Sequence, residues 1–299
     1  MKITKISTLV GLAMSGAIVF QVAHATEGGG SIYPMGAESF LSGALPPPGF
    51  YTLVYASNYS ADKLKDNNGN TVPLDFKVTA NAVVPRFVWV TDKKLFGGQV
   101  GHALLVPLVN LDVNVNGVGQ SKSGIGDIDI TALVLGYHHS PNLHSIFGLD
   151  IMAPTGRYNK ADMANIGRNY WAIQPVYTAS YINPAGWNAD FKMMLDFNFK
   201  NTDTNYKSGN EFHIDYSLGY GFKQNWVAGV GGYMYKQITT DEQNNVKLPD
   251  NKGQAFAIGP SIKYDNGKGM FVMAKWQKEM NVENRPEGHA FWIKALLPF

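Results

Sequence analysis

Four polar side chains near residue 215 share the spacing of one face of an extended strand. Glu211, His213, Asp215 and Ser217 stand two positions apart, so in a strand all four point to the same side. Histidine beside serine and carboxylate suggests hydrolase chemistry. Along a strand, however, Ser217 lies about 13 Å from His213, too far for a hydrogen bond between nucleophile and base. No G-x-S-x-G motif occurs either. We therefore predict no catalytic residue and no enzymatic activity.

Three histidines form a second group of residues with possible chemistry, in this case as metal ligands. His138 and His139 precede His144, with Pro141 in the predicted turn between them. Adjacent residues of a strand point to opposite faces, so only one of the first two could share a site with His144. We interpret all three as exposed turn residues. The chain has no cysteine, which excludes disulfides and thiolate metal sites, and we predict neither a metal nor a cofactor.

Polar and apolar positions alternate through most of the chain after residue 50. The clearest examples are 187–200 and 211–223. The second presents Phe212, Ile214, Tyr216, Leu218, Tyr220 and Phe222 on one face. Alternation of this kind fits either a β-sandwich or a membrane barrel whose apolar face meets lipid.

The lengths of the connections distinguish these two folds. The predicted strands are 50–60, 73–91, 97–110, 125–137, 143–153, 169–182, 187–200, 211–223, 225–238, 253–265, 269–281 and 289–299. Short turns alternate with longer polar loops, among them 111–124, as in outer-membrane barrels. We therefore predict an all-β fold: a single antiparallel transmembrane β-barrel of about 12 strands, with short periplasmic turns and longer extracellular loops.

Prolines interrupt some of these strands. Pro85, Pro107 and Pro175 each remove a backbone donor, which predicts bulges in a closed sheet. The apolar phase is expected to change near Pro85, so that Arg86 points inward and Trp89 outward.

The last nine residues close the predicted barrel. Apolar side chains alternate through 291–299 and end on Phe299. This ending resembles the C-terminal signal by which outer-membrane barrels are recognised for insertion. We expect the barrel assembly machinery to bind Phe299, and the final strand to pair with the first and leave no free edge.

The first 49 residues divide into two parts. Residues 1–25 have a basic start, an apolar stretch and an Ala-His-Ala site, so we predict a signal peptide and a mature chain beginning near Thr26. Residues 26–49 are rich in glycine and proline, and we expect this segment at the periplasmic end, able to enter the lumen as a plug. Its apolar candidates are Ile32, Tyr33, Phe40 and Leu41. We predict that residues 50–299 form the barrel.

Charged and other polar residues on the polar strand faces are predicted to line the lumen. These candidates are Arg86, Asp127, Asp129, Asp150, Gln174, Asp190, Lys192, Asp196, Glu211, His213, Asp215, Lys275, Glu279 and Lys294. Because unpaired charges in a low dielectric are costly, they should pair or contact lumen water. They could form a cross-strand network that stiffens the wall, a constriction that selects solutes, or both.

Several motifs carry a resemblance to a known family. They are Gly28-Gly-Gly-Ser-Ile-Tyr-Pro-Met-Gly36, Pro46-Pro-Pro-Gly-Phe-Tyr51, Gly124-Ile-Gly-Asp-Ile128, Ala153-Pro-Thr-Gly-Arg-Tyr158 and Ser208-Gly-Asn-Glu-Phe-His-Ile-Asp-Tyr216. The chain resembles the bacterial outer-membrane proteins involved in the meta-pathway of phenol degradation (SphA-like proteins). The resemblance implies a transporter-type barrel for aromatic or other hydrophobic compounds.

The expected function is passage of small hydrophobic or aromatic compounds through the outer membrane into the periplasm. The alternative is an outer-membrane barrel with a structural or surface-recognition role and no transport. We expect contacts with membrane lipid, lipopolysaccharide and a hydrophobic solute. A net charge of only +2 and the lack of a basic run predict no nucleic-acid partner.

Overall fold

Long antiparallel strands build nearly the whole chain in the computed structural model, which describes residues 26–223 and 225–297. The strands of the wall are β1 (Gly49–Leu64), β2 (Phe76–Leu95), β3 (Gly98–Leu105), β4 (Leu108–Val115), β5 (Val118–Ile125), β6 (Ile128–His138), β7 (Leu143–Ala153), β8 (Ala172–Tyr181), β9 (Trp187–Asn198), β12 (Glu211–Phe222), β13 (Trp226–Gln237), β16 (Gln254–Asp265), β17 (Phe271–Glu283) and β18 (Pro286–Leu297). β3 runs on into β4, and β5 into β6, so the wall crosses the membrane 12 times.

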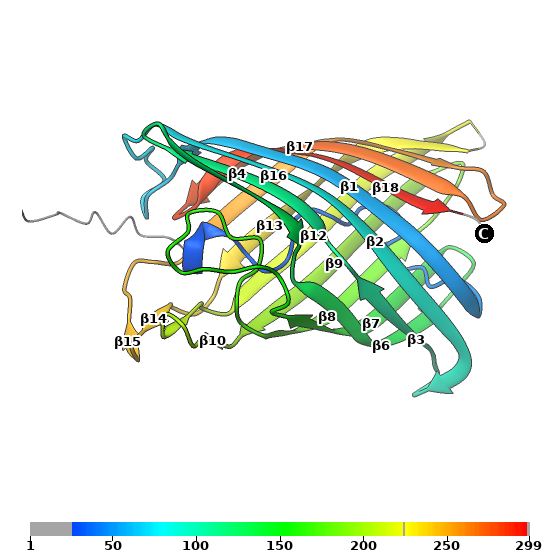
Figure 1. Ribbon diagram of the computed structural model, residues 1–299. Helices are drawn as coiled ribbons and strands as arrows, with labels where there is room; N and C mark the ends of the chain where they lie inside the picture. Colours follow the sequence, from blue (N-terminus) through cyan, green and yellow to red (C-terminus); the bar gives the residue numbers. More distant parts are fainter. Residues whose placement is uncertain (1–25, 224, 298–299) are drawn as a thin grey trace, which may run out of the picture.

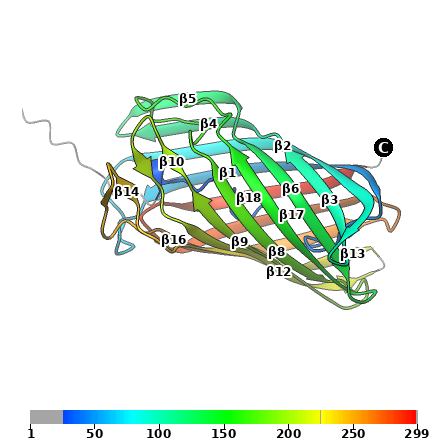
Figure 2. The same ribbon diagram turned by 90° about the horizontal axis from the view of Figure 1, so that it is seen from below.

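The sheet closes on itself as predicted (Figures 1 and 2). Strand β1 pairs with β2 on one side and with β18 on the other, and Tyr55 lies opposite Lys294 in the closing pair. Closure satisfies the backbone groups that a free edge would leave unpaired in lipid. The prediction of an antiparallel outer-membrane barrel is confirmed.

Interior and exterior faces alternate along each strand. In β12, Glu211, His213 and Asp215 are at most 1% exposed, whereas Leu218 and Tyr220 on the opposite face are 47% and 50% exposed. In β18, Phe291 and Ile293 are exposed and Lys294 is buried. Because side chains repeat every two residues in a strand, the sequence pattern alone predicts this division.

Prolines mark an interruption in one part of the wall. Val83 lies opposite Leu108 in β4, and Arg86 lies opposite Leu105 in β3, so both sides advance by three residues and the register does not shift. Between these pairs Pro85 accepts a backbone hydrogen bond from Val106. The ladder with β2 is therefore split without a bulge, contrary to the expectation for Pro85. On the other side of Pro107 the register moves by one residue, from Leu105 opposite Asp129 to Leu108 opposite Ile125, as expected of a bulge. In β8, Pro175 causes no shift of register with β7.

The predicted loop 111–124 is wrong, because these residues belong to the hairpin of β4 and β5. Asn116 and Gly117 form its turn with φ of 51° and 81°. An Asn-Gly turn with both φ values positive matches the twist of a two-residue hairpin, so the sequence did contain the signal.

The β4–β5 hairpin extends past the end of β7 and rests on loop 154–171. Gln120 of β5 accepts a hydrogen bond from the Ala164 nitrogen and donates one to Asp162, and Lys122 lies 2.5 Å from Asp162. Side chains thus cover an edge of β5 that no strand pairs with among residues 26–223 and 225–297.

Long loops gather at one end of the barrel. Four short strands form a separate small sheet there: β10 (Lys200–Asn201), β11 (Tyr206–Lys207), β14 (Glu242–Gln243) and β15 (Val246–Lys247). Figure 1 shows them at the left, away from the C-terminal end. By the usual orientation this is the extracellular end, and the short turns are periplasmic. No helix of the described chain is long and apolar enough to cross a membrane. The predicted signal peptide 1–25 and Phe299 lie outside the described residues.

Candidate functional site: a lumen occupied by residues 26–48

Residues 26–48, called here the N-terminal segment, run through the barrel from one end to the other. The 3₁₀ turn η1 (Glu27–Gly29) lies among the long extracellular loops, where Glu27 accepts hydrogen bonds from Tyr158 and Asn201. The segment then reaches the periplasmic end, where β1 begins at Gly49. The segment was expected at the periplasmic end and able to enter the lumen; in the structure only its last residues lie at that end.

Asp215 of β12 holds the middle of the N-terminal segment. Its carboxylate accepts hydrogen bonds from the Tyr33 hydroxyl at 2.8 Å and from the Gly36 and Glu38 nitrogens, each at 2.9 Å. Lys192 of β9 lies over the Tyr33 ring, 4.8 Å from its centre. These partners satisfy a carboxylate that is 1% exposed.

Glu38 is the centre of the charged contacts in the lumen. Its carboxylate lies 2.6 Å from Lys294 Nζ and 3.1 Å from Arg86 Nη1, and it accepts a hydrogen bond from the Tyr55 hydroxyl at 2.9 Å. The Glu38 carbonyl also accepts a hydrogen bond from Lys275 at 2.8 Å. Cations from β2, β17 and β18 therefore converge on one residue of the N-terminal segment, which offsets the cost of burying its charge.

The last part of the segment packs against the opposite wall. Ser42 donates its backbone hydrogen to Asp190 at 3.1 Å, and Gly43 donates to Ser180 at 2.7 Å. Phe40 is 1% exposed and Leu45 is 6% exposed, each within a cluster of apolar wall residues. Because these contacts come from strands all round the barrel, the segment occupies the lumen rather than one side of it.

The apolar residues singled out from the sequence differ in their surroundings. Tyr33 and Phe40 are buried in contact with the wall. Leu41 packs beside the Phe40 cluster, with φ of 68°, and Ile32 is only partly buried.

Asp196, Glu211 and His213 form a buried cluster near the extracellular end. They offer ligand atoms within 4.8 Å of one another. His213 Nε2 lies 2.8 Å from Asp196, a hydrogen-bonding distance, and 3.4 Å from Glu211. Ser31 donates to Glu211 and Gln174 donates to Asp196. The cluster therefore acts as a hydrogen-bonded charge network that joins the N-terminal segment to β9 and β12.

Most other predicted lumen residues are buried in the wall. Asp150 is 4% exposed and Lys192 is 8% exposed. Asp129 has a buried oxygen that finds no hydrogen-bond partner among the described residues, and Glu279 accepts hydrogen bonds from Tyr59 and Tyr233.

Asp127 does not line the lumen, contrary to the prediction. It lies between β5 and β6 and accepts backbone hydrogen bonds from Gly156 at 2.9 Å and Arg168 at 2.6 Å. It therefore holds the two ends of loop 154–171, because the interruption of the strand turns its side chain toward that loop.

Sequence reasoning missed Glu38 altogether. A lone carboxylate in a glycine- and proline-rich segment has no periodicity that assigns it to a face. The available signal was the set of inward-facing cations, Arg86, Lys192, Lys275 and Lys294, which require a counter-charge.

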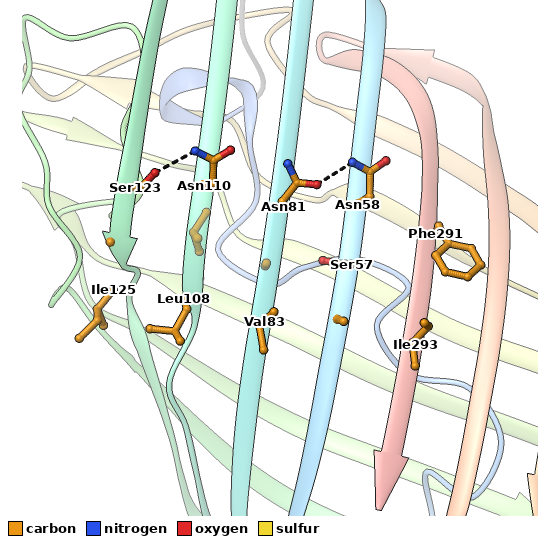
Figure 3. A pocket seen from close by; sticks show the side chains of 14 residues that line it. Ser57, Asn58, Asn81, Val83, Leu108, Asn110, Ser123, Ile125, Phe291 and Ile293 are labelled. Carbon is orange, nitrogen blue, oxygen red and sulfur yellow. Dashed lines mark hydrogen bonds between the residues drawn. The ribbon is translucent and has the colours of Figure 1, made fainter.

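A shallow groove of about 590 Å³ lies on the outer face of the wall beside the proline interruption (Figure 3). One register row across it is apolar and joins Ile293, Ala56, Val83, Leu108 and Ile125. The next row toward the extracellular end is mostly polar, with Asn58 bonded to Asn81 at 2.7 Å and Asn110 bonded to Ser123 at 2.8 Å. The change from apolar to polar marks the upper boundary of the lipid-facing surface here.

Comparison with solved structures supports the fold. An outer membrane channel from Pseudomonas putida F1 matches with a TM-score of 0.75 at 19% identity, over 86% of this chain and 97% of that chain. The translocator domain of the autotransporter NalP from Neisseria meningitidis matches over 86% and 91% at 10% identity, but its TM-score of 0.48 carries no argument. Comparison with the curated proteins finds no match.

The sequence itself matches a family model over residues 61–295. That range begins in β1, ends in β18 and includes all the wall strands between them. The chain therefore belongs to the family described as "Putative MetA-pathway of phenol degradation".

Proposed function

We propose that this protein is an outer-membrane channel for passage of small hydrophobic or aromatic compounds into the periplasm, and that the N-terminal segment closes its lumen. The observation that carries the proposal is the course of residues 26–48 through the barrel, with charged contacts centred on Glu38. A segment that precedes the first strand can move without breaking the closed sheet.

The wall supports a role as a channel because its inward polar groups bind the N-terminal segment. Asp215 and Asp190 accept hydrogen bonds from it, and Lys294 donates one to its Glu38. Withdrawal of the segment would leave a polar path in a barrel of intermediate size, between side-chain-filled and water-filled kinds.

Two features support a hydrophobic or aromatic solute. The family description refers to phenol degradation. The groove on the outer wall presents Val83, Leu108 and Ile125, against which an apolar molecule can lie.

Uptake into liposomes tests this proposal. Vesicles containing the protein should take up labelled monoaromatic compounds faster than sugars or amino acids of similar size, relative to protein-free vesicles. Because aromatic compounds also cross lipid directly, the protein-dependent part of the rate is the measured quantity. No protein-dependent uptake of any solute would favour the second candidate, a barrel that recognises surfaces through its loops. The small external sheet of β10, β11, β14 and β15 is the feature that favours it.

We also propose that the barrel assembly machinery binds Phe299 and that lipopolysaccharide contacts the outer wall. Phe299→Ala should lower the amount of folded barrel in the outer membrane far more than the transport rate per inserted molecule. Heat-modifiable gel migration measures the first quantity and liposome uptake the second. Equal assembly of variant and wild type would contradict the role of Phe299.

A further inference from the structure

The backbone nitrogen of Thr26 lies beside a buried carboxylate among the extracellular loops. Thr26 N lies 3.1 Å from Asp241 Oδ2; Thr26 is 1% exposed and Asp241 is 0% exposed. Asp241 lies between β13 and β14, outside the barrel wall. The predicted signal-peptide cleavage, after Ala25, falls at this same nitrogen.

Asp241 is saturated with neutral hydrogen-bond donors. Besides Thr26, its oxygens accept from the Gly209 nitrogen and Gln237 at 2.6 Å each, from Tyr206 at 2.5 Å and from Asn251 at 2.6 Å. Burial nevertheless raises the pKa of the Asp241 carboxyl, against the lowering effect of the hydrogen bonds from Tyr206, Gly209, Gln237 and Thr26.

No charged partner compensates this carboxylate within the described residues. No Lys, Arg or His of 26–223 and 225–297 forms a salt bridge with Asp241. Buried carboxylates are ordinarily paired, because hydrogen bonds alone do not replace the lost hydration of the charge. A cation beside Asp241 would therefore stabilise this buried charge.

The backbone of Thr26 gives a second, independent indication. Its φ is 63°, a conformation that is an outlier for a β-branched residue. The angle φ is defined by the carbonyl carbon of the preceding residue. A residue that begins a chain has no φ, so removal of Ala25 removes this restriction.

We propose that Asp241 is the binding site for the α-ammonium group of Thr26 that forms when the signal peptide is removed. Signal peptidase adds water across the Ala25–Thr26 peptide bond, giving a carboxylate on Ala25 and an amine on Thr26, which takes up a proton. The new charge replaces a neutral amide nitrogen 3.1 Å from Asp241. Processing thereby latches the extracellular end of the N-terminal segment. This inference does not depend on transport.

Neighbouring contacts position the amine for this role. The Thr26 hydroxyl donates to the Gly30 carbonyl at 2.9 Å, and the Glu27 nitrogen donates to the Ser208 hydroxyl at 3.1 Å. Tyr158 and Asn201 bind the Glu27 carboxylate. Three extracellular loops thus hold the segment where its first residue meets Asp241.

The test uses full-length protein exported to the outer membrane and purified folded. Intact mass should correspond to a chain beginning at Thr26. An amine-reactive reagent at neutral pH, followed by digestion and mass spectrometry, then measures labelling of the Thr26 amine. In the folded wild type we expect labelling at least about tenfold slower than in the denatured protein, because reaction requires local opening.

Asp241→Asn should raise the labelling rate in the folded barrel by about tenfold, and Asp250→Asn is the matched control. Asp250 lies exposed in the same loop with φ of 59°, which asparagine tolerates. Heat-modifiable migration confirms that each variant is folded. A second variant leaves every described side chain intact. It carries one glycine inserted before Thr26, which stays on the chain after cleavage and moves the amine by about 3.5 Å. Its amine should be labelled as fast as that of Asp241→Asn.

Three results would overturn the proposal. They are a mature chain that begins elsewhere than Thr26, an amine labelled as fast in the folded as in the denatured wild type, and equal labelling of wild type and both variants. Slow labelling that is lost in Asp241→Asn and in the glycine insertion, but kept in Asp250→Asn, supports it.

Discussion

Lys294 Nζ lies 2.6 Å from Glu38 Oε2, which joins the last strand of the barrel to the segment that precedes the first. Both side chains are at most 7% exposed. Arg86 adds a second cation at 3.1 Å, so the pair is part of a small charge network. The contact can form only when the barrel has closed around the N-terminal segment.

Glu38→Gln should weaken the attachment of this segment. Loss of the carboxylate leaves Lys294 and Arg86 buried without their partner, and breaking such a pair costs about 3–5 kcal/mol. We expect a lower urea midpoint and more frequent opening in planar bilayers. Glu242→Gln in β14 of the small external sheet is the control. A variant with the midpoint and conductance of the wild type would show that the network does not hold the segment.

Deletion of residues 28–48 tests the segment as a plug. Single-channel conductance should increase severalfold, because the wall then encloses a path free of the segment. Deletion of residues 243–248, at the tip of an external hairpin, controls for shortening of the chain. Unchanged conductance after the first deletion would refute the plug.

Gly136→Ala should displace the plug without removing any contact of the wall. A Cβ at Gly136 would lie 2.7 Å from the Cβ of Leu45, and the other close atoms also belong to Leu45. Overpacking of this kind costs about 1–3 kcal/mol. Increased conductance is expected, and Leu45→Gly in the same chain should restore the closed state, because it removes the Leu45 Cβ together with the rest of the side chain. If the second substitution does not restore the closed state, the increased conductance comes from a change in the barrel wall and not from displacement of the plug.

The contact between Lys122 and Asp162 should depend on pH. A hydrogen bond from Lys122, with another from Gln120, lowers the pKa of Asp162 below the usual value of about 3.9. A lowered pKa in the folded state means that the contact stabilises the folded state above about pH 3.9 and is lost as pH falls through the folded value. Hydrogen exchange of loop 154–171, corrected for intrinsic rates, should therefore accelerate at low pH. In Asp162→Asn this excess acceleration should be absent; its persistence there would assign the effect to another group.

The strands and their faces follow from the sequence to a large extent. In 187–200 and 211–223 the alternation fixes which side chains share a face, because a strand repeats every two residues. The pairing of β18 with β1 follows from the need to leave no edge in lipid. The β4–β5 hairpin was missed although Asn116-Gly117 marked its turn, because polar residues around that turn also suit a loop.

The path of the N-terminal segment was decided by the tertiary structure alone. Residues 26–48 have no periodicity, so no local rule places Glu38 beside Lys294 or Thr26 beside Asp241. Those contacts join residues 256 and 215 positions apart. The first depends on cations that remain uncompensated inside the closed barrel, and the second on loops that meet at its extracellular end. The sequence determined the wall because alternation is a local property, whereas only closure of the wall determined what its interior binds.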